Sequence, residues 1–213
     1  MVQTSYRSEP LNYVLSISDG DVPADGWPVI LFLHGSGERG IDPDLVRQYG
    51  LPRFIDEGLK VPFIVLSPQC PEGETWDTQV VPTGVLMEDV LGSLPTNKHR
   101  KYVTGLSMGG HGCWFMGITY PERFAAMAMI CAPVANADLE RDAPVLKNMP
   151  VWIFHGEADS VVPVDDAYRY QAALMAVGNP PRMTIYPGVD HNAWDAAYGE
   201  PDFFDWLLRH QLT

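Results

Sequence analysis

The glycine-rich segment Gly105 to His111, which reads GLSMGGH, is the feature that most constrains how this 213-residue chain folds. It follows a short apolar run and precedes a stretch of helical spacing that ends at Tyr120. Glycines two residues either side of a serine let a strand reverse sharply into a helix, and that context is typical of a nucleophile elbow. We therefore predict Ser107 as a nucleophile. The alternative is a strand-to-helix turn with a purely structural role.

Short apolar runs alternate with longer segments of helical spacing along the whole chain. The runs predict strands at Tyr13 to Ile17, Val29 to Leu33, Phe63 to Leu66, Tyr102 to Thr104, Ala126 to Ile130, Val151 to Phe154 and Met183 to Tyr186. The longer segments predict helices at Asp44 to Gly58, Thr83 to Leu94, Met108 to Tyr120, Val164 to Val177 and Asp202 to His210. Strands that are apolar throughout are buried on both faces, which favours an α/β fold with a mostly parallel, doubly wound sheet. We expect one domain over residues 1 to 213, with helices on both faces and no separate lid domain.

Several chemically reactive residues directly follow predicted strands. These are the loop that begins at His34, then Ser107, Asp159 and His191. Because ligands of parallel sheets bind beyond the carboxyl ends of the strands, we expect these residues to meet at one edge.

A serine nucleophile needs a histidine as its base. His191 follows the last predicted strand, and the order Ser, Asp, His is the one that α/β hydrolases use. We therefore predict His191 as the base; the alternative is a surface-loop histidine.

The carboxylate that orients the base is expected on a loop between the serine and the histidine. Asp159 fits, since it lies between a buried strand and a helix in the segment HGEADSVVP. The same position would suit an aspartate that caps the helix. Glu157, Asp190 and Asp138 are the other candidates.

Two backbone N–H groups are expected to bind the oxyanion. One is that of Met108, the residue after the serine. The other is that of Ser36, with Gly37 as second choice, because the glycine-rich loop HGSGERG brings the backbone close to a bound carbonyl. That loop lacks the lysine and the spacing of a phosphate-binding loop. We expect His34 and Arg39 to brace it.

The charge and the cysteine content limit which binding partners, metals and cofactors we expect. Twenty-seven Asp and Glu residues against 14 Lys and Arg residues give a net charge of −13, which disfavours nucleic acids and anionic membrane surfaces. Cys70, Cys113 and Cys131 show no metal-ligand spacing, so we read them as free thiols and expect neither a metal nor a cofactor.

The chain starts without a signal-peptide pattern, which favours the cytoplasm; a signal peptide preceding this sequence would instead favour the periplasm or secretion. The pattern does not indicate an oligomeric state.

The segments LHGSGERG, GLSMGG, HGEADSVVP and GVDHNAW, in this order, resemble the small serine esterases of the α/β-hydrolase superfamily. The resemblance is to the group that holds carboxylesterases, dienelactone hydrolases and relatives of prolyl oligopeptidase. Dienelactone hydrolases carry a cysteine where this chain has Ser107, and prolyl oligopeptidases carry a propeller domain that this chain lacks. The resemblance implies an α/β-hydrolase fold and a carboxylesterase that needs no cofactor.

The residues indicate the type of reaction more clearly than they indicate which ester is the substrate. Trp76 and Trp194 flank the predicted site in sequence, so we expect both to line a pocket for short-chain or aromatic esters; packing against the loops is the alternative. A feruloyl or acetyl ester of a plant polysaccharide is compatible with the resemblance. There are two alternative functions. The chain could be a thioesterase or amidase that uses the same three residues, or a ligand-binding protein on a hydrolase scaffold.

Overall fold

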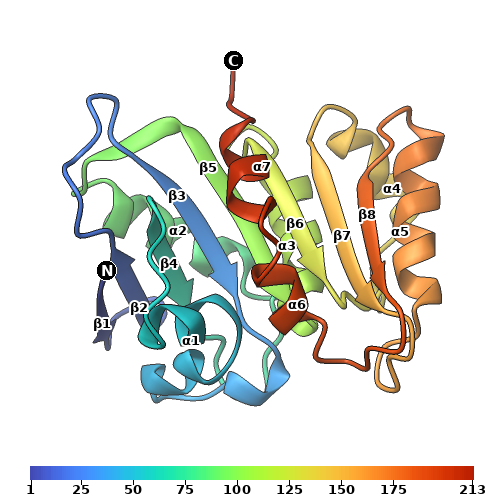
Figure 1. Cartoon of the computed structure of the whole chain (residues 1–213), viewed down its shortest axis with the longest axis horizontal. Helices are drawn as coiled ribbons and strands as arrows, with labels where there is room; N and C mark the ends of the chain where they lie inside the picture. Colours follow the sequence, from blue (N-terminus) through green and yellow to red (C-terminus); the bar gives the residue numbers. More distant parts are fainter.

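One sheet of eight strands runs through the computed structural model, which describes residues 1–213. Its spatial order is β1-β2-β4-β3-β5-β6-β7-β8 (Figure 1). The strands are β1 (Val2–Tyr6), β2 (Tyr13–Ile17), β3 (Trp27–Leu33), β4 (Ile64–Pro68), β5 (Thr96–Leu106), β6 (Ala126–Ile130), β7 (Val151–Gly156) and β8 (Arg182–Tyr186). The pairs β1–β2 and β2–β4 are antiparallel, and every other pair is parallel. The predicted mostly parallel sheet is therefore confirmed.

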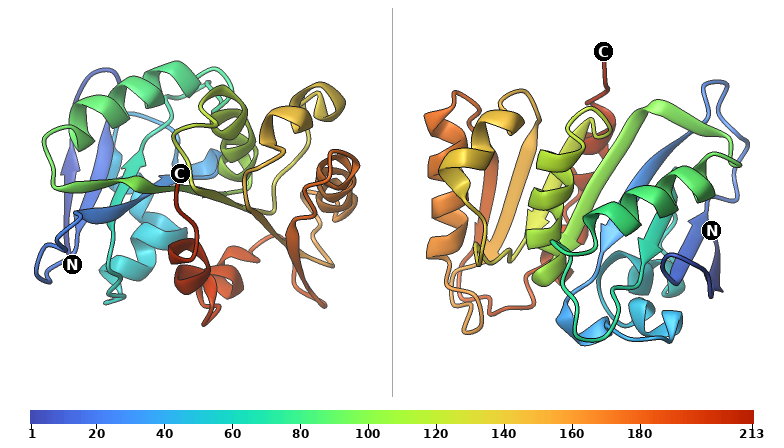
Figure 2. Two further views of the ribbon diagram at one scale, coloured as in Figure 1. Left: turned by 90° about the horizontal axis from the view of Figure 1, so that it is seen from above. Right: turned by 180° about the vertical axis from the view of Figure 1, so that it is seen from behind.

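Helices cover both faces of this sheet. They are α1 (Gly50–Asp56), α2 (Val80–Leu91), α3 (Met108–Thr119), α4 (Leu139–Asp142), α5 (Asp165–Ala176), α6 (Trp194–Tyr198) and α7 (Phe203–Leu208), with 3-10 helices η1 (Ser36–Glu38), η2 (Pro43–Gln48) and η3 (Ala143–Leu146). Figure 2 shows α2, α3, α4 and α5 on one face and α1, α6 and α7 on the other. No helix is both long and apolar enough to cross a membrane.

The two faces of the sheet carry two separate hydrophobic cores, of 32 and 24 buried residues. β3 contributes to both: Val29 and Leu31 lie in the first core, and Ile30 and Phe32 in the second. Alternate side chains of a strand point to opposite faces, so a strand covered on both sides must be apolar at every position. This is why the central strands were visible in the sequence as unbroken apolar runs.

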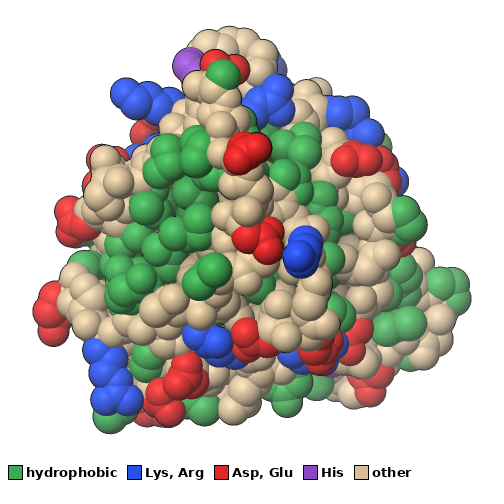
Figure 3. Space-filling view, turned by 60° about the vertical axis from the view of Figure 1, so that its left-hand side comes forward, with side chains coloured by type: hydrophobic (Ala, Val, Ile, Leu, Met, Phe, Trp, Pro, Cys, Tyr) green, Lys and Arg blue, Asp and Glu red, His purple; other side chains and the backbone are tan.

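The outer parts of the fold differ from the prediction. β1 was not predicted, because this edge strand is half exposed and has no apolar run; Val2 and Tyr6 remain open to solvent. Figure 3 shows the molecule from this side, with hydrophobic side chains gathered on the upper half and both signs of charge interspersed around them. β5 is also longer than predicted, because its first half is polar; it pairs with β3 at Thr96 and Trp27 and then shifts register before Lys101.

The predicted helix Asp44 to Gly58 is in fact two elements, η2 and α1. The chain turns between them at Gly50, which has a φ of +61°. A Cβ atom at Gly50 would lie 2.8 Å from the ring of Phe32, so the close approach of this turn to β3 requires glycine. The short helix α6 was not predicted either.

Candidate active site

The loops that follow β3, β5, β6, β7 and β8 meet at the carboxyl ends of the parallel strands, toward the bottom of Figure 1. Ser107 follows β5, Asp159 follows β7 and His191 follows β8. The sheet therefore brings together three residues that are up to 84 positions apart in the sequence.

Ser107 lies at a strained turn between β5 and α3. Its φ of +53° and ψ of −120° lie outside the regions that a serine ordinarily adopts. The turn fits because two neighbours have no side chain: a Cβ atom at Gly109 would lie 1.9 Å from the carbonyl oxygen of Leu33, and one at Gly105 would lie 2.5 Å from that of Gly109. The turn exposes the serine hydroxyl beside the first, unbonded N–H groups of α3.

His191 lies between the serine and the aspartate. Its Nε2 atom is 2.9 Å from Oγ of Ser107, and its Nδ1 atom is 2.8 Å from Oδ2 of Asp159. With the proton on Nδ1, the ring donates to the carboxylate and keeps the Nε2 lone pair free to accept the serine proton. The imidazole is 18% exposed, while the Asp159 side chain is fully buried.

The buried carboxylate of Asp159 has several partners besides the base. Its Oδ1 atom accepts the backbone N–H groups of Val161 and Val162 at 2.9 and 2.8 Å. Asp159 does not cap the following helix, since the N-cap of α5 is Val164. Its Oδ1 atom shapes the loop before α5 instead, while Oδ2 faces His191.

A second histidine also faces Asp159. Nε2 of the fully buried His155 lies 2.9 Å from the carbonyl oxygen of Val162 and 3.2 Å from Oδ2 of Asp159. Both neighbours are acceptors, so Nε2 carries the proton and shares it between them. Nδ1 of His155 has no partner. The sequence prediction missed this contact, although the spacing of four residues between the end of β7 and the loop after it was a usable signal.

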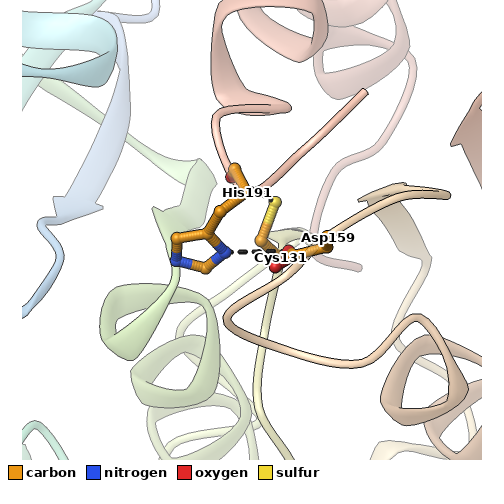
Figure 4. A group of neighbouring side chains, drawn as sticks. All are labelled: Cys131, Asp159 and His191. Carbon is orange, nitrogen blue, oxygen red and sulfur yellow. Dashed lines mark hydrogen bonds and ion pairs between the residues drawn. The ribbon is translucent and has the colours of Figure 1, made fainter. Parts of the chain in front are cut away.

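Cys131 is the third group beside Asp159. It directly follows β6, has a φ of +48°, is fully buried and donates from its thiol to the backbone oxygen of His191 at 3.1 Å. Burial, and to a smaller extent the charge of Asp159, together raise the pKa of this thiol to about 12. Figure 4 shows Cys131, Asp159 and His191 side by side.

The other acidic candidates contact different groups. Asp190 accepts from both the backbone and the side chain of Ser160, and from the backbone of His191, so it ties the two loops together. Those hydrogen bonds lower the pKa of Asp190. Glu157 accepts from the backbone of Gly188, and Asp138 caps α4.

The loop after β3 carries the predicted second oxyanion donor. Ser36, Ser107 and Met108 all line one cavity of about 430 Å³. His34 accepts from the backbone N–H of Cys70 at 2.9 Å, and Arg39 donates to the carbonyl of Ser36 at 2.9 Å. Both therefore brace this loop, as their positions in the sequence suggested.

The two tryptophans occupy different surroundings. Trp76 is 1% exposed and donates from its indole to the carbonyl of His34 at 2.9 Å, so it packs beneath the loop and does not line the cavity. Trp194 contacts the edge of His191, with ring centres 5.4 Å apart, and lies against Tyr49. This packing contradicts the expectation that Trp76 lines the pocket, and Trp194 is not among the residues that line this cavity either.

A hydrogen-bonded polar chain forms part of the cavity wall. Nε2 of His111 lies 2.9 Å from Oδ1 of Asn136, whose amide donates to Asp77 at 2.9 Å. Burial alone would raise the pKa of Asp77, but hydrogen bonds from Thr75 and Asn136 outweigh this effect and lower it. Thr75, Asp77, His111 and Asn136 all line the cavity, and no pattern in the sequence groups them.

Comparisons with known proteins show which proteins this chain is similar to. The model of the dienelactone hydrolase family matches residues 77–197. A poly(3-hydroxyoctanoate) depolymerase from Pseudomonas fluorescens is 27% identical over 90% of this chain and 77% of its own length.

Solved structures show the same fold. A thermostable esterase is 28% identical with a TM-score of 0.79, over 99% of this chain; the chain spans 63% of that protein. A feruloyl esterase module from Clostridium thermocellum, in complex with sinapinate, has a TM-score of 0.72 at 14% identity, over 97% of this chain and 86% of the module.

Proposed function

Because this chain belongs to the dienelactone hydrolase family, we propose that it hydrolyses short-chain or aromatic carboxylic esters through Ser107, His191 and Asp159. The observation that carries the proposal is the position of His191, which lies within hydrogen-bonding distance of the serine on one side and the aspartate on the other.

The proposed reaction has two steps. Oγ of Ser107 attacks the ester carbonyl while Nε2 of His191 takes its proton and passes it to the leaving alcohol. Water then attacks the acyl enzyme, with His191 again as the base. Asp159 stabilises the imidazolium that forms in each step.

Two backbone N–H groups stabilise the oxyanion in this proposal. That of Met108 lies at the start of α3, where no carbonyl of the helix accepts it, and that of Ser36 lies on the facing loop. Gly37 is the second choice on that loop. In other enzymes the removal of one such donor costs about 3 kcal/mol of transition-state stabilisation.

The cavity size supports a small acyl or aromatic group. At about 430 Å³ it lies toward the lower end of small-molecule pockets, which span roughly 300–1,000 Å³. Val161, Val162 and Pro133 provide apolar lining, in addition to the polar chain of His111, Asn136 and Asp77.

A panel of p-nitrophenyl esters from acetate to palmitate tests the proposal. We expect short chains to be preferred and Ser107→Ala and His191→Ala to lower kcat by about 10⁴-fold or more. The panel includes a 3-hydroxy acid ester because of the depolymerase relative, together with a thioester and an anilide. Turnover that persists in Ser107→Ala contradicts the mechanism. Faster turnover of the thioester or the anilide would favour the alternative activities, and no turnover at all would favour a binding protein.

The assignment of the carboxylate has its own test. Asp159→Asn is expected to lower kcat by about 10⁴-fold, because an amide no longer holds the tautomer of His191 that accepts the serine proton. Glu157→Gln is the matched control on the same loop and is expected to leave kcat nearly unchanged. The opposite ranking in steady-state kinetics would assign the role to Glu157.

A further inference from the structure

We propose that Cys131, Asp159 and His191 form an inhibitory binding site for a thiophilic divalent cation such as Zn²⁺ or Cd²⁺. The sulfur of Cys131, a carboxylate oxygen of Asp159 and Nδ1 of His191 all lie within 4.8 Å of one another. The proposal concerns the same residues as the proposed esterase mechanism, but the binding of the ion does not depend on that mechanism.

The three groups suit such an ion chemically. Thiolate, imidazole and carboxylate are the ligands that zinc uses in proteins, at about 2.3, 2.0 and 2.1 Å from the metal. A tetrahedral ion with these bond lengths separates its ligand atoms by roughly 3.3–3.6 Å. The present separations therefore require shifts of no more than about an ångström and a half.

The three ligands come from separate strand ends, which explains why no spacing in the sequence indicates the site. Cys131 follows β6, Asp159 follows β7 and His191 follows β8. Neighbouring parallel strands bring these ends together. Figure 4 shows the resulting cluster, in which the ring of His191 is directed at Asp159 and the sulfur lies beside them.

The exposed edge of His191 provides the route of entry. The imidazole side chain is 18% exposed, whereas Asp159 and Cys131 are buried beneath it. An ion that arrives at this edge replaces the hydrogen bond between His191 and Asp159. Water supplies the fourth ligand.

Metal binding at Nδ1 would switch off the base. A neutral imidazole that binds a metal through Nδ1 carries its proton on Nε2. Nε2 then donates to Oγ of Ser107 and no longer accepts the serine proton. The thiol releases one proton to solvent as it binds the ion, and the imidazole keeps one proton, moved from Nδ1 to Nε2.

Zinc titration of the esterase reaction gives the first test. We expect full inhibition that a chelator reverses. Cys131→Ser is expected to raise the half-inhibitory concentration about tenfold or more, since each 1.4 kcal/mol of binding energy is a factor of ten. Cys70→Ser, another buried thiol, is the matched control and should remain as sensitive as the parent. Equal sensitivity of Cys131→Ser and the parent would overturn the proposal.

Cadmium binding gives a test that does not depend on activity. We expect the parent, Cys70→Ser and Ser107→Ala to show the ultraviolet charge-transfer band of a cadmium–thiolate bond, with saturation at one ion per chain. We expect Cys131→Ser to lack this band. Cys131→Ala serves if the serine variant does not fold, and His191→Asn, which keeps the thiol, should weaken binding. Absence of the band in the parent or in Ser107→Ala overturns the metal site even where the esterase proposal holds. A lack of esterase activity with the band present would overturn only the proposed function.

Discussion

At the scale of the residue, the carboxylate of Asp159 shows how one side chain serves two purposes. Oδ1 is used by the backbone turn that shapes its own loop, and Oδ2 faces the imidazoles of His191 and His155. Asp159, His191 and Ser107 were each predicted from their position after a strand. His155 was not, because its contact with Asp159 depends on how the loop folds back on the end of β7.

His155 is expected to tune the base through this carboxylate. His155→Leu removes a donor from Asp159, so the carboxylate holds more negative charge toward His191 and stabilises the imidazolium more strongly. We expect the acidic limb of the kcat/KM profile to move to higher pH, by on the order of half a pH unit. The measurement is a pH–rate profile.

His155→Gln is the control for this prediction, since its side-chain amide can restore the donor. It is expected to leave the acidic limb near that of the parent. A purely structural role for His155 would instead reduce thermal stability or kcat in both variants without moving the limb.

At the scale of the element, the elbow depends on backbone contact between α3 and the end of β3. The sequence predicted the strand, the turn and the helix there, and the structure shows Met108–Thr119 against a predicted Met108 to Tyr120. The prediction of a single helix from Asp44 to Gly58 was wrong, because a helical pattern of apolar residues does not reveal a turn that packs on the sheet. Gly50 was the available sign of that break.

Gly109→Ala is expected to disrupt the elbow. Its Cβ atom would lie 1.9 Å from the carbonyl oxygen of Leu33, and both groups belong to the backbone, so the turn must move. We expect a loss of about 3 kcal/mol or more in the free energy of unfolding, measured by urea denaturation, together with a large loss of kcat.

Gly20→Ala is the matched control for the elbow. A Cβ atom at Gly20 meets nothing closer than 3.4 Å, at the ring of Trp27, and the position is outside the site. This variant should keep nearly the activity and stability of the parent. A Gly109→Ala variant with parental kcat would show that the close approach is not required.

At the scale of the whole molecule, ionic contacts at the far edge of the sheet hold α7 to β8. Asp202, at the start of α7, pairs with Arg182 on β8 and with Arg209 just beyond the helix. Hydrogen bonds from Arg209 and then Arg182 lower the pKa of Asp202 to about 2. α7 seals the second core with Trp206 and Leu207, so this link joins the C-terminal segment to the rest of the fold.

The lowered pKa of Asp202 predicts a dependence of stability on pH. A carboxyl whose folded pKa lies below its ordinary value contributes stability above that ordinary value and loses the contribution as the pH falls through the folded pKa. We expect Asp202→Asn to lower the Tm at pH 7, with the difference from the parent shrinking between about pH 4 and pH 2.

Asp205→Asn, on the same helix but outside the ion pairs that Asp202 makes with Arg182 and Arg209, is the control for the Tm measurement and should lie close to the parent. The interpretation fails if the difference between Asp202→Asn and the parent stays constant down to pH 2. The contacts are exposed to solvent, so salt should reduce the effect.

The sequence by itself determined the central strands, the elbow and the order of the serine, aspartate and histidine, because burial on both faces and a tight turn leave local patterns in the chain. Only the tertiary structure decided which side chains share a cavity or a carboxylate. Trp76 turned out to brace a loop, and Cys131 and His155 turned out to contact the same aspartate. The contacts of Trp76 and Cys131 join residues that are far apart in the sequence, and no local pattern records such distances. The contact of His155 spans only four residues but depends on how its loop folds back on the end of β7.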